Sequence, residues 1–262
     1  MPILSPEPPS APVFYPKENY NIAKYTDITK FISLLFKQSL FFCRVDKLED
    51  KFEGTSYKTN FEARIREMKQ MVNSGRMTVK LSDDDILKSV KEDEEFEEKQ
   101  RALHCINCWN KSENESAALW KIYSDFSQGI MIQSSILNIV SAFNETTEDI
   151  QISEVNYRVY NKSVLPYGNS NYPFLYKQKA YNYENEVRLI YSVSSASNLN
   201  WQYDWSKEEV EEGLYIKVDL NKLINKIVIS PYSPKWFYDL IADLINKYGL
   251  DKQIEKSEFS IF

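Results

Sequence analysis

Glu184, Glu186 and Arg188 stand at alternate positions in the second half of the chain. Side chains alternate between the two faces of a β-strand, so a strand over 184–193 would turn all three residues to one side. Carboxylates at i and i+2 lie about 6–7 Å apart, and each disfavours the ionisation of the other, while the arginine opposes that shift. The pattern predicts one ionised base or electrostatic stabiliser beside one orienting group. An exposed strand with a cross-strand salt bridge would show the same spacing.

A hydroxyl and two large aromatic side chains share one side of a second predicted element. A capping-box pattern at 112–115 predicts the start of a helix, on which Ser116, Trp120 and Tyr123 face one way. Lys24 and Tyr25 precede the first predicted helix and form a pair that could grip a nucleotide. Ligand pockets often form where a strand leads into such a helix, although the same aromatic residues could be ordinary core.

Composition excludes several other kinds of site. The chain has 262 residues, a net charge of −6, six glycines and a single histidine. No two glycines lie within ten residues of one another, so no glycine-rich loop can cradle a phosphate. One imidazole cannot build a site that needs two. An acidic chain without a basic block lacks the charge pattern of a duplex-binding protein, although aromatic residues could still stack on a single strand.

The cysteines allow one metal alternative. Cys105 and Cys108 have the spacing of a zinc clip, but only His104 and Cys43 could complete it. The surrounding segment has the pattern of a buried strand, so packing is the favoured interpretation and no metal is expected. An odd number of cysteines, with no signal peptide and no membrane-spanning stretch, indicates a soluble cytoplasmic protein that does not engage membranes.

The chain divides into a tail and one domain. Six of the ten prolines fall in the first sixteen residues, which predicts a flexible tail over 1–19. Residues 20–262 form the domain, with an acidic helical insertion at 56–101. Strands are expected over 40–45, 103–109, 130–133, 150–160, 184–193, 214–219 and 226–230, and helices start near 27, 112, 136 and 234. Several neighbouring strands lack a helix between them, which favours an α+β fold with a mixed, mostly antiparallel sheet and flanking helices.

Five motifs in this order resemble the bacterial domain-of-unknown-function 2971 family over Tyr20 to Ser257. The motifs are Lys24-Tyr25-Thr26, Leu48 to Gly54, Cys108-Trp109 with Glu115-Ser116 and Leu119-Trp120-x-x-Tyr123, the string Lys177…Tyr181-x-x-Glu184-x-Glu186-x-Arg188, and Val218-Asp219-Leu220 with Val228-x-Ser230-Pro231. The family's Asn-Asp-Pro-Phe-Glu loop is replaced here by residues 49–53, and its tryptophan before the paired glutamates is replaced by Tyr181.

That family has no settled activity, but its layout is similar to ADP-ribosyltransferase-like toxins and effectors. The resemblance implies that Glu186 binds the ribose hydroxyl and stabilises the cation formed as nicotinamide leaves NAD, and that Glu184 orients or deprotonates the acceptor. It further implies roles for six other residues: Ser116 in positioning, Tyr25 and Trp120 in stacking, Lys24 or Arg188 at the pyrophosphate, and Tyr123 among the cofactor-binding residues. Such chemistry needs neither metal nor histidine.

Three hypotheses stay open at this point. The first is an NAD-consuming ADP-ribosyltransferase or NAD glycohydrolase, acting as a toxin or phage-defence effector on a protein or nucleic-acid acceptor. The second is a non-enzymatic sensor that binds a nucleotide or a single strand. The third is a carboxylate-metal nuclease built on Asp50, Glu53, Glu184 and Glu186.

Overall fold

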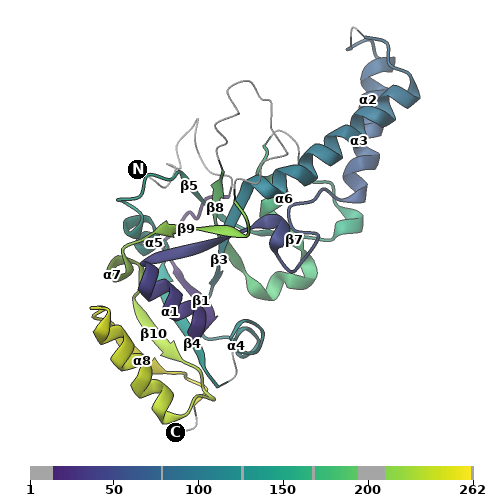
Figure 1. Cartoon of the computed structure of the whole chain (residues 1–262). Coiled ribbons are helices and arrows are strands. Elements are labelled where there is room, and N and C mark those ends of the chain that lie inside the picture. Colours follow the sequence, from purple (N-terminus) through teal and green to yellow (C-terminus); the bar gives the residue numbers. More distant parts are fainter. Residues whose placement is uncertain (1–13, 78, 125–126, 167–168, 194–209, 261–262) are drawn as a thin grey trace.

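A nine-stranded sheet forms the centre of the computed structural model, which describes residues 14–77, 79–124, 127–166, 169–193 and 210–260 (Figure 1). Seven strands follow one another in the order β11 (Gln253–Lys256), β10 (Lys226–Ile229), β4 (Gly129–Ser135), β1 (Asn21–Asp27), β3 (His104–Lys111), β2 (Ser39–Arg44) and β9 (Gly213–Lys217). The other two strands are β8 (Glu186–Ser192), which pairs with β3, and β5 (Ile150–Glu154), which pairs with β8. Only the β10–β11 pair of this described sheet is parallel, so the predicted α+β class with a mostly antiparallel sheet is confirmed.

Strand β3 joins the two halves of the sheet. Along one edge it pairs with β8 from His104 opposite Ser192 to Asn110 opposite Glu186. Along the other edge its last residues pair with β1 and its first residues pair with β2. Side chains of β3 and β8 that lie opposite one another share a face, so Cys108 and Asn110 are on the same face as Arg188 and Glu186.

The large hydrophobic core lies on the opposite face of the sheet. Buried strand residues such as Trp109 and Val187 contact apolar residues of four helices there. The helices are α1 (Ile28–Lys37), α5 (Ile136–Ala142), α7 (Leu220–Leu223) and α8 (Lys235–Lys247). In α1 the buried residues are Phe31, Leu34 and Leu35, the spacing of one helical stripe, and Asp27 caps the helix by accepting a hydrogen bond from the backbone N–H of Lys30.

Shorter elements cover the face that carries Glu186. Helix α4 (Ala117–Tyr123) places Leu119 and Trp120 against β1 and β4. Helix α6 (Tyr172–Leu175) packs Phe174 and Leu175 against Ile106 and Ile190. Two short parallel strands, β6 (Asn156–Arg158) and β7 (Tyr176–Gln178), and the 3-10 helix η4 (Lys179–Glu184) lead the chain into β8.

A helical hairpin projects from the sheet (Figure 1). It consists of α2 (Lys58–Asn73) and α3 (Asp83–Gln100), which we call the arm, and it occupies the region where the helical insertion is expected. Ser82 and Asp85 form a capping box at the start of α3. Three more 3-10 turns complete the described elements: η1 (Val45–Lys47), η2 (Arg101–Leu103) and η3 (Tyr160–Lys162).

The packed chain begins before Tyr20. Phe14 lies edge-on to Tyr176 with ring centroids 5.6 Å apart, and its carbonyl accepts a hydrogen bond from the backbone N–H of Glu154 at 2.8 Å. Residues 1–13 of the expected flexible tail lie outside the described residues. No helix within the described ranges is long and apolar enough to cross a membrane.

Four predicted elements differ from the structure. The helix expected to start at the capping box 112–115 begins at Ala117, because Ser116 is the residue whose hydroxyl caps it. Residues 21–27 form strand β1 and not only an entrance to the first helix. The strand expected over 150–160 is divided into β5 and β6. The strand expected over 184–193 begins only at Glu186, because Glu184 ends η4 and Asn185 has a left-handed backbone with φ +43°.

Candidate active site

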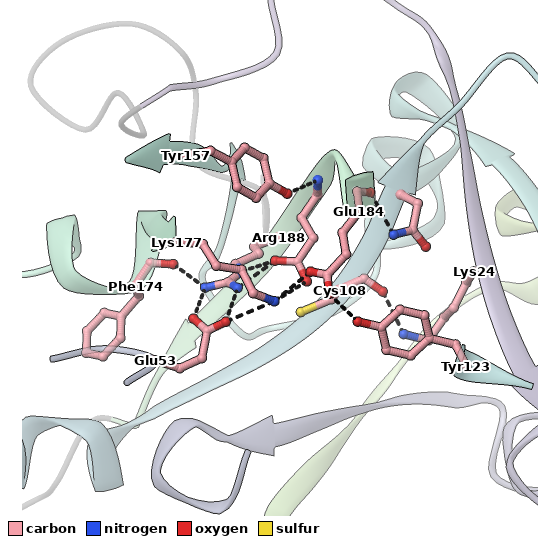
Figure 2. A network of polar contacts seen from close by, with 11 residues as sticks. Lys24, Glu53, Cys108, Tyr123, Tyr157, Phe174, Lys177, Glu184 and Arg188 are labelled. Carbon is pink, nitrogen blue, oxygen red and sulfur yellow. Dashed lines mark hydrogen bonds and ion pairs between the residues drawn. The ribbon is translucent and has the colours of Figure 1, made fainter. Parts of the chain in front are cut away.

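Five buried charged side chains meet on the face of β8 that is turned away from the large core. They are Glu53, Lys177, Glu184, Glu186 and Arg188, and we call them the charge network. Figure 2 shows the labelled members of this network pointing toward one another across the sheet. The network contains three acids and two bases, so its formal charge is −1 when all five are ionised. A burial this complete excludes the interpretation of an exposed strand face.

Each member comes from a different turn or strand, except for the pair on β8. Glu186 and Arg188 are two residues apart on β8 and share a face, as the alternation predicts. Glu184 joins them in a different way from the prediction, because it lies at the end of η4 and the left-handed Asn185 turns the chain between them. Lys177 lies on β7, and Glu53 lies on the loop before the arm.

Every N–H group of the Arg188 guanidinium donates a hydrogen bond. Its Nε and Nη2 donate to Glu186 at 2.8 and 2.5 Å, and its Nη1 and Nη2 donate to the two oxygens of Glu53 at 2.9 Å each. Nη1 also donates to the carbonyl of Phe174 at 2.7 Å. Because a guanidinium has five N–H groups, these five bonds use its whole capacity. A pyrophosphate, which the resemblance implies for Lys24 or Arg188, would have to displace a carboxylate from Arg188 in this arrangement.

Lys177 lies among the three carboxylates. Its Nζ is 2.6 Å from Glu184, 3.1 Å from Glu53 and 3.4 Å from Glu186. The ammonium also lies 4.8 Å from the ring centroid of Tyr181, the aromatic residue expected near the glutamates. Burial alone would lower the pKa of Lys177, but the charges of Glu186 and Glu53 raise it above its ordinary value. Lys177 therefore stays protonated and supplies the cation that the clustered acids need.

The two paired glutamates have opposite pKa shifts. Burial would raise the pKa of Glu186, but the positive charges of Arg188 and Lys177 outweigh burial and lower it. Burial followed by the negative charge of Glu186 raises the pKa of Glu184, and the contacts with Lys177 and Tyr123 only partly offset this. Glu186 is thus held ionised, while Glu184 accepts a proton more readily than an ordinary carboxylate. The opposite shifts come from different surroundings: Glu186 lies beside two cations, whereas Glu184 lies beside Glu186.

Three neutral side chains orient the glutamates. The hydroxyl of Tyr123 donates to Glu184 at 2.5 Å. Tyr123 is 40% exposed, so it connects the buried network with the protein surface. The hydroxyl of Tyr157 accepts a hydrogen bond from the backbone N–H of Glu186 at 2.8 Å. Asn110 donates its side-chain amide to the carbonyl of Glu184, also at 2.8 Å.

Lys24 and Cys108 lie next to the network. The Lys24 Nζ donates to the carbonyl of Cys108 at 2.8 Å and lies 5.8 Å from the ring centroid of Trp109. Burial lowers the pKa of Lys24, and Glu186 is among the charges that act on it. Burial, followed by the charge of Glu186, raises the pKa of the Cys108 thiol to about 12. Cys105 belongs to the core on the opposite face of β3, so the two cysteines cannot clip one ion.

The other predicted site residues form a separate cluster under α4. Tyr25 and Trp120 lie edge to face with centroids 5.0 Å apart, and they are 6% and 1% exposed. The Tyr25 hydroxyl accepts from the backbone N–H of Ser116 at 2.8 Å, and the Ser116 hydroxyl caps α4 by accepting from Leu119. Trp120 donates its indole N–H to Glu115 at 2.9 Å. The structure thus brings Tyr123, Arg188 and Lys24 to the glutamates and leaves Ser116, Tyr25 and Trp120 in packing and capping positions.

Three residues that contact the paired glutamates or Arg188 were not among the predicted catalytic and cofactor-binding residues. Lys177 and Glu53 stand in the quoted motifs, and an acidic loop around one aromatic residue was a usable signal for Glu53. Nothing in the sequence indicates Tyr157, because its contact with the backbone of Glu186 spans 29 residues. Within the described part of the chain, no group of three or more His, Cys, Asp or Glu residues is arranged to hold a metal ion.

Comparison with solved structures includes a likeness of low similarity. The structure described as "Thermus sp. 2.9 DarT in complex with carba-NAD+" aligns with 94% of this chain and 98% of that chain, with 10% sequence identity and a TM-score of 0.37. No protein-family model matches the chain, and no curated protein sequence matches it. At this identity and TM-score the likeness defines no function, and the resemblance to the domain-of-unknown-function 2971 family stays a prediction.

Proposed function

We propose that this protein breaks the N-glycosidic bond between nicotinamide and ribose in NAD, as an ADP-ribosyltransferase or an NAD glycohydrolase. The observation that carries the proposal is the division of roles between two neighbouring buried carboxylates. Glu186 is fixed and ionised by Arg188 and Lys177, whereas Glu184 has a raised pKa. Enzymes that cleave glycosidic bonds commonly use two carboxyl groups whose surroundings hold their pKa values apart.

Each glutamate has one role in the proposed reaction: Glu186 stabilises the cation and Glu184 accepts a proton. As the bond between C1′ of the ribose and the nicotinamide nitrogen breaks, its electron pair leaves with nicotinamide and C1′ becomes an oxocarbenium-like cation. The fixed negative charge of Glu186 stabilises that cation, and burial strengthens the attraction because little water screens it. A hydroxyl or water oxygen of the acceptor then bonds to C1′, and Glu184 takes the proton that this oxygen loses.

The remaining parts of the site support binding and access. Tyr123 is an exposed side chain bonded to Glu184, so we assign the entry of substrate to its side of the network. Lys24 lies next to the network and donates to the carbonyl of Cys108, and we assign it to the phosphates of the substrate. Water as acceptor would make the protein an NAD glycohydrolase, and a protein or nucleic-acid acceptor would make it a transferase. Either reaction suits a toxin or phage-defence effector.

The two alternatives have less support from the geometry. In a nuclease the carboxylates would hold a metal ion, but the Lys177 ammonium already lies between Glu53, Glu184 and Glu186. Asp50 is engaged in its own loop, where it accepts from the backbone N–H of Phe52 at 2.9 Å. A sensor that stacks a base on Trp120 would have to expose a side chain that packs against Tyr25.

Release of nicotinamide from NAD by the purified full-length chain tests the proposal. The wild type should release nicotinamide, and Glu186→Gln should lower the rate about 10²- to 10³-fold, because one fixed charge at the reacting centre is lost. Glu255→Gln is the control, since Glu255 pairs with Lys226 between β10 and β11 at the far end of the sheet. A wild type that neither cleaves NAD nor labels protein, DNA or RNA, or a fully active Glu186→Gln, would refute the proposal.

A further inference from the structure

Glu53 reaches the charge network from a loop that is otherwise at the surface. Lys51 and Phe52 are exposed, but the Glu53 side chain turns inward and is only 3% exposed. The Asp50 carboxylate fixes the start of this turn through the backbone N–H of Phe52. Gly54 ends the turn with φ +74°, where an added Cβ would lie 2.7 Å from the ring of Phe174. The loop is therefore shaped to deliver one carboxylate to the interior.

The Glu53 carboxylate contacts the two cations of the network. One oxygen accepts from Arg188 Nη1 and the other from Nη2, both at 2.9 Å, and Lys177 lies 3.1 Å away. On its other edge Arg188 donates to Glu186. The guanidinium is thus clamped between two carboxylates in the planar, two-bond geometry that fixes its orientation. Glu53 thus keeps the Arg188 guanidinium from rotating, and the guanidinium in turn holds the Glu186 carboxylate in place.

Glu53 also decides the charge of the network. Without it the two remaining acids would balance the two bases, whereas with it the cluster carries one excess negative charge. An excess negative charge in a buried site favours a cation that forms beside it, and the effect is larger than in water. The side chain therefore acts on the glutamates through both the position of Arg188 and the net charge.

We infer that Glu53 is a positioning residue that holds Arg188 and Lys177 so that Glu186 and Glu184 keep their orientation and the site keeps its excess negative charge. The part of this inference that concerns turnover rests on the proposed function. The part that concerns the geometry of Arg188 does not.

The variant Glu53→Gln tests both parts, because it keeps the size of the side chain and removes its charge. Asp46→Asn is the matched control: Asp46 also holds an arginine through two bonds, to Arg44 Nε at 2.7 Å and Nη2 at 2.9 Å, but outside the network. The first measurement is the exchange rate with water of the Arg188 Nε proton, followed by NMR on the full-length chain and assigned by its loss in Arg188→Lys. The second is the pH dependence of kcat and KM for NAD.

Glu53→Gln should speed exchange of the Arg188 Nε proton about tenfold or more and lower kcat about tenfold, with KM changed less than about threefold. The acid limb of kcat should move to lower pH, because loss of a nearby negative charge favours the ionised carboxylate. A merely destabilised protein would lower the active fraction without moving that limb. Unchanged exchange in Glu53→Gln, or equal changes in Asp46→Asn, would overturn the inference. If the wild type proves inactive on NAD, the proposed function fails, while the exchange measurement still decides the role of Glu53.

Discussion

Lys177 on β7 and Glu184 at the end of η4 are seven residues apart, and their Nζ and Oε2 atoms lie 2.6 Å from each other. The same ammonium contacts Glu53 and Glu186. A single lysine thus makes it possible to bury three carboxylates beside one arginine. Its removal would leave that arginine alone against three acids, which is the costly state of a broken buried ion pair.

Lys177→Met should therefore reduce the free energy of unfolding by about 3–5 kcal/mol at neutral pH. The loss should be smaller at acidic pH, because protonation of one freed carboxylate relieves the repulsion. Urea denaturation at the two pH values measures both effects. Lys226→Met is the control, since its partner Glu255 is partly exposed, and it should cost about 1 kcal/mol or less. Equal losses in the two variants would contradict the central role of Lys177.

Tyr123→Phe should move the acid limb of the pH–rate profile to higher pH. The Tyr123 hydroxyl donates to Glu184 and so stabilises its ionised form. Loss of that bond raises the pKa of Glu184 further, and the base becomes available only at higher pH. Tyr238→Phe, which removes a hydroxyl that donates to the carbonyl of Ile254 next to α8, should leave the profile unchanged. A shift to lower pH in Tyr123→Phe would count against Glu184 as the base.

Gly54→Ala and Gly75→Ala separate backbone strain from steric overlap. Both glycines have left-handed backbones, with φ +74° and +69°, so alanine is strained at either position by about 1 kcal/mol. Only at Gly54 would the new Cβ also approach Phe174 and Val45 to within 3 Å, whereas nothing lies within 4 Å at Gly75. Chemical denaturation should show at least about 1–3 kcal/mol more destabilisation at Gly54. Similar destabilisation by the two substitutions would mean that the loop around Gly54 can shift to accommodate the added Cβ.

Asp27→Ala should remove the cap of α1 and lower the free energy of unfolding by about 1 kcal/mol. Burial would raise the pKa of Asp27, but its hydrogen bonds with Thr29 and Lys30 outweigh burial and lower the pKa to about 2. The contribution of the carboxylate is therefore complete above the ordinary pKa of 3.8 and is lost as the pH falls toward 2. Thermal denaturation of wild type and Asp27→Ala should converge in that acidic range. A constant gap would show that capping does not depend on the charge.

The fold was largely predictable because most of its elements have a strong local pattern. The stripe of Phe31 and Leu35 defines α1, and Ser82 with Asp85 marks the start of α3. Strand β1 was missed because it is followed directly by a helix cap at Asp27 and has no turn signal between them. The start of β8 was misplaced because alternation continues through Asn185, although the backbone there is left-handed.

The site was predictable only in part, since local spacing places neighbours on one face but does not tell which distant groups reach them. Glu186 and Arg188 could be paired from alternation alone. The contact of Arg188 with Glu53 joins residues 135 positions apart, which no pattern in one sequence reveals. Trp120 was expected to stack on a ligand because buried and ligand-binding aromatic residues look alike at helical spacing; the structure packs it against Tyr25.

The arm occupies the connection between β2 and β3, two strands that are direct antiparallel neighbours. A pair of this kind is usually closed by a short turn, so the order of strands does not depend on the arm. During folding, the loop-closure entropy of joining β2 to β3 rises only logarithmically with the length of the connection. Local formation of the two helices shortens the flexible part of that connection before the strands meet. The arm can therefore vary in length or be exchanged between proteins at little kinetic cost to the sheet that carries the charge network.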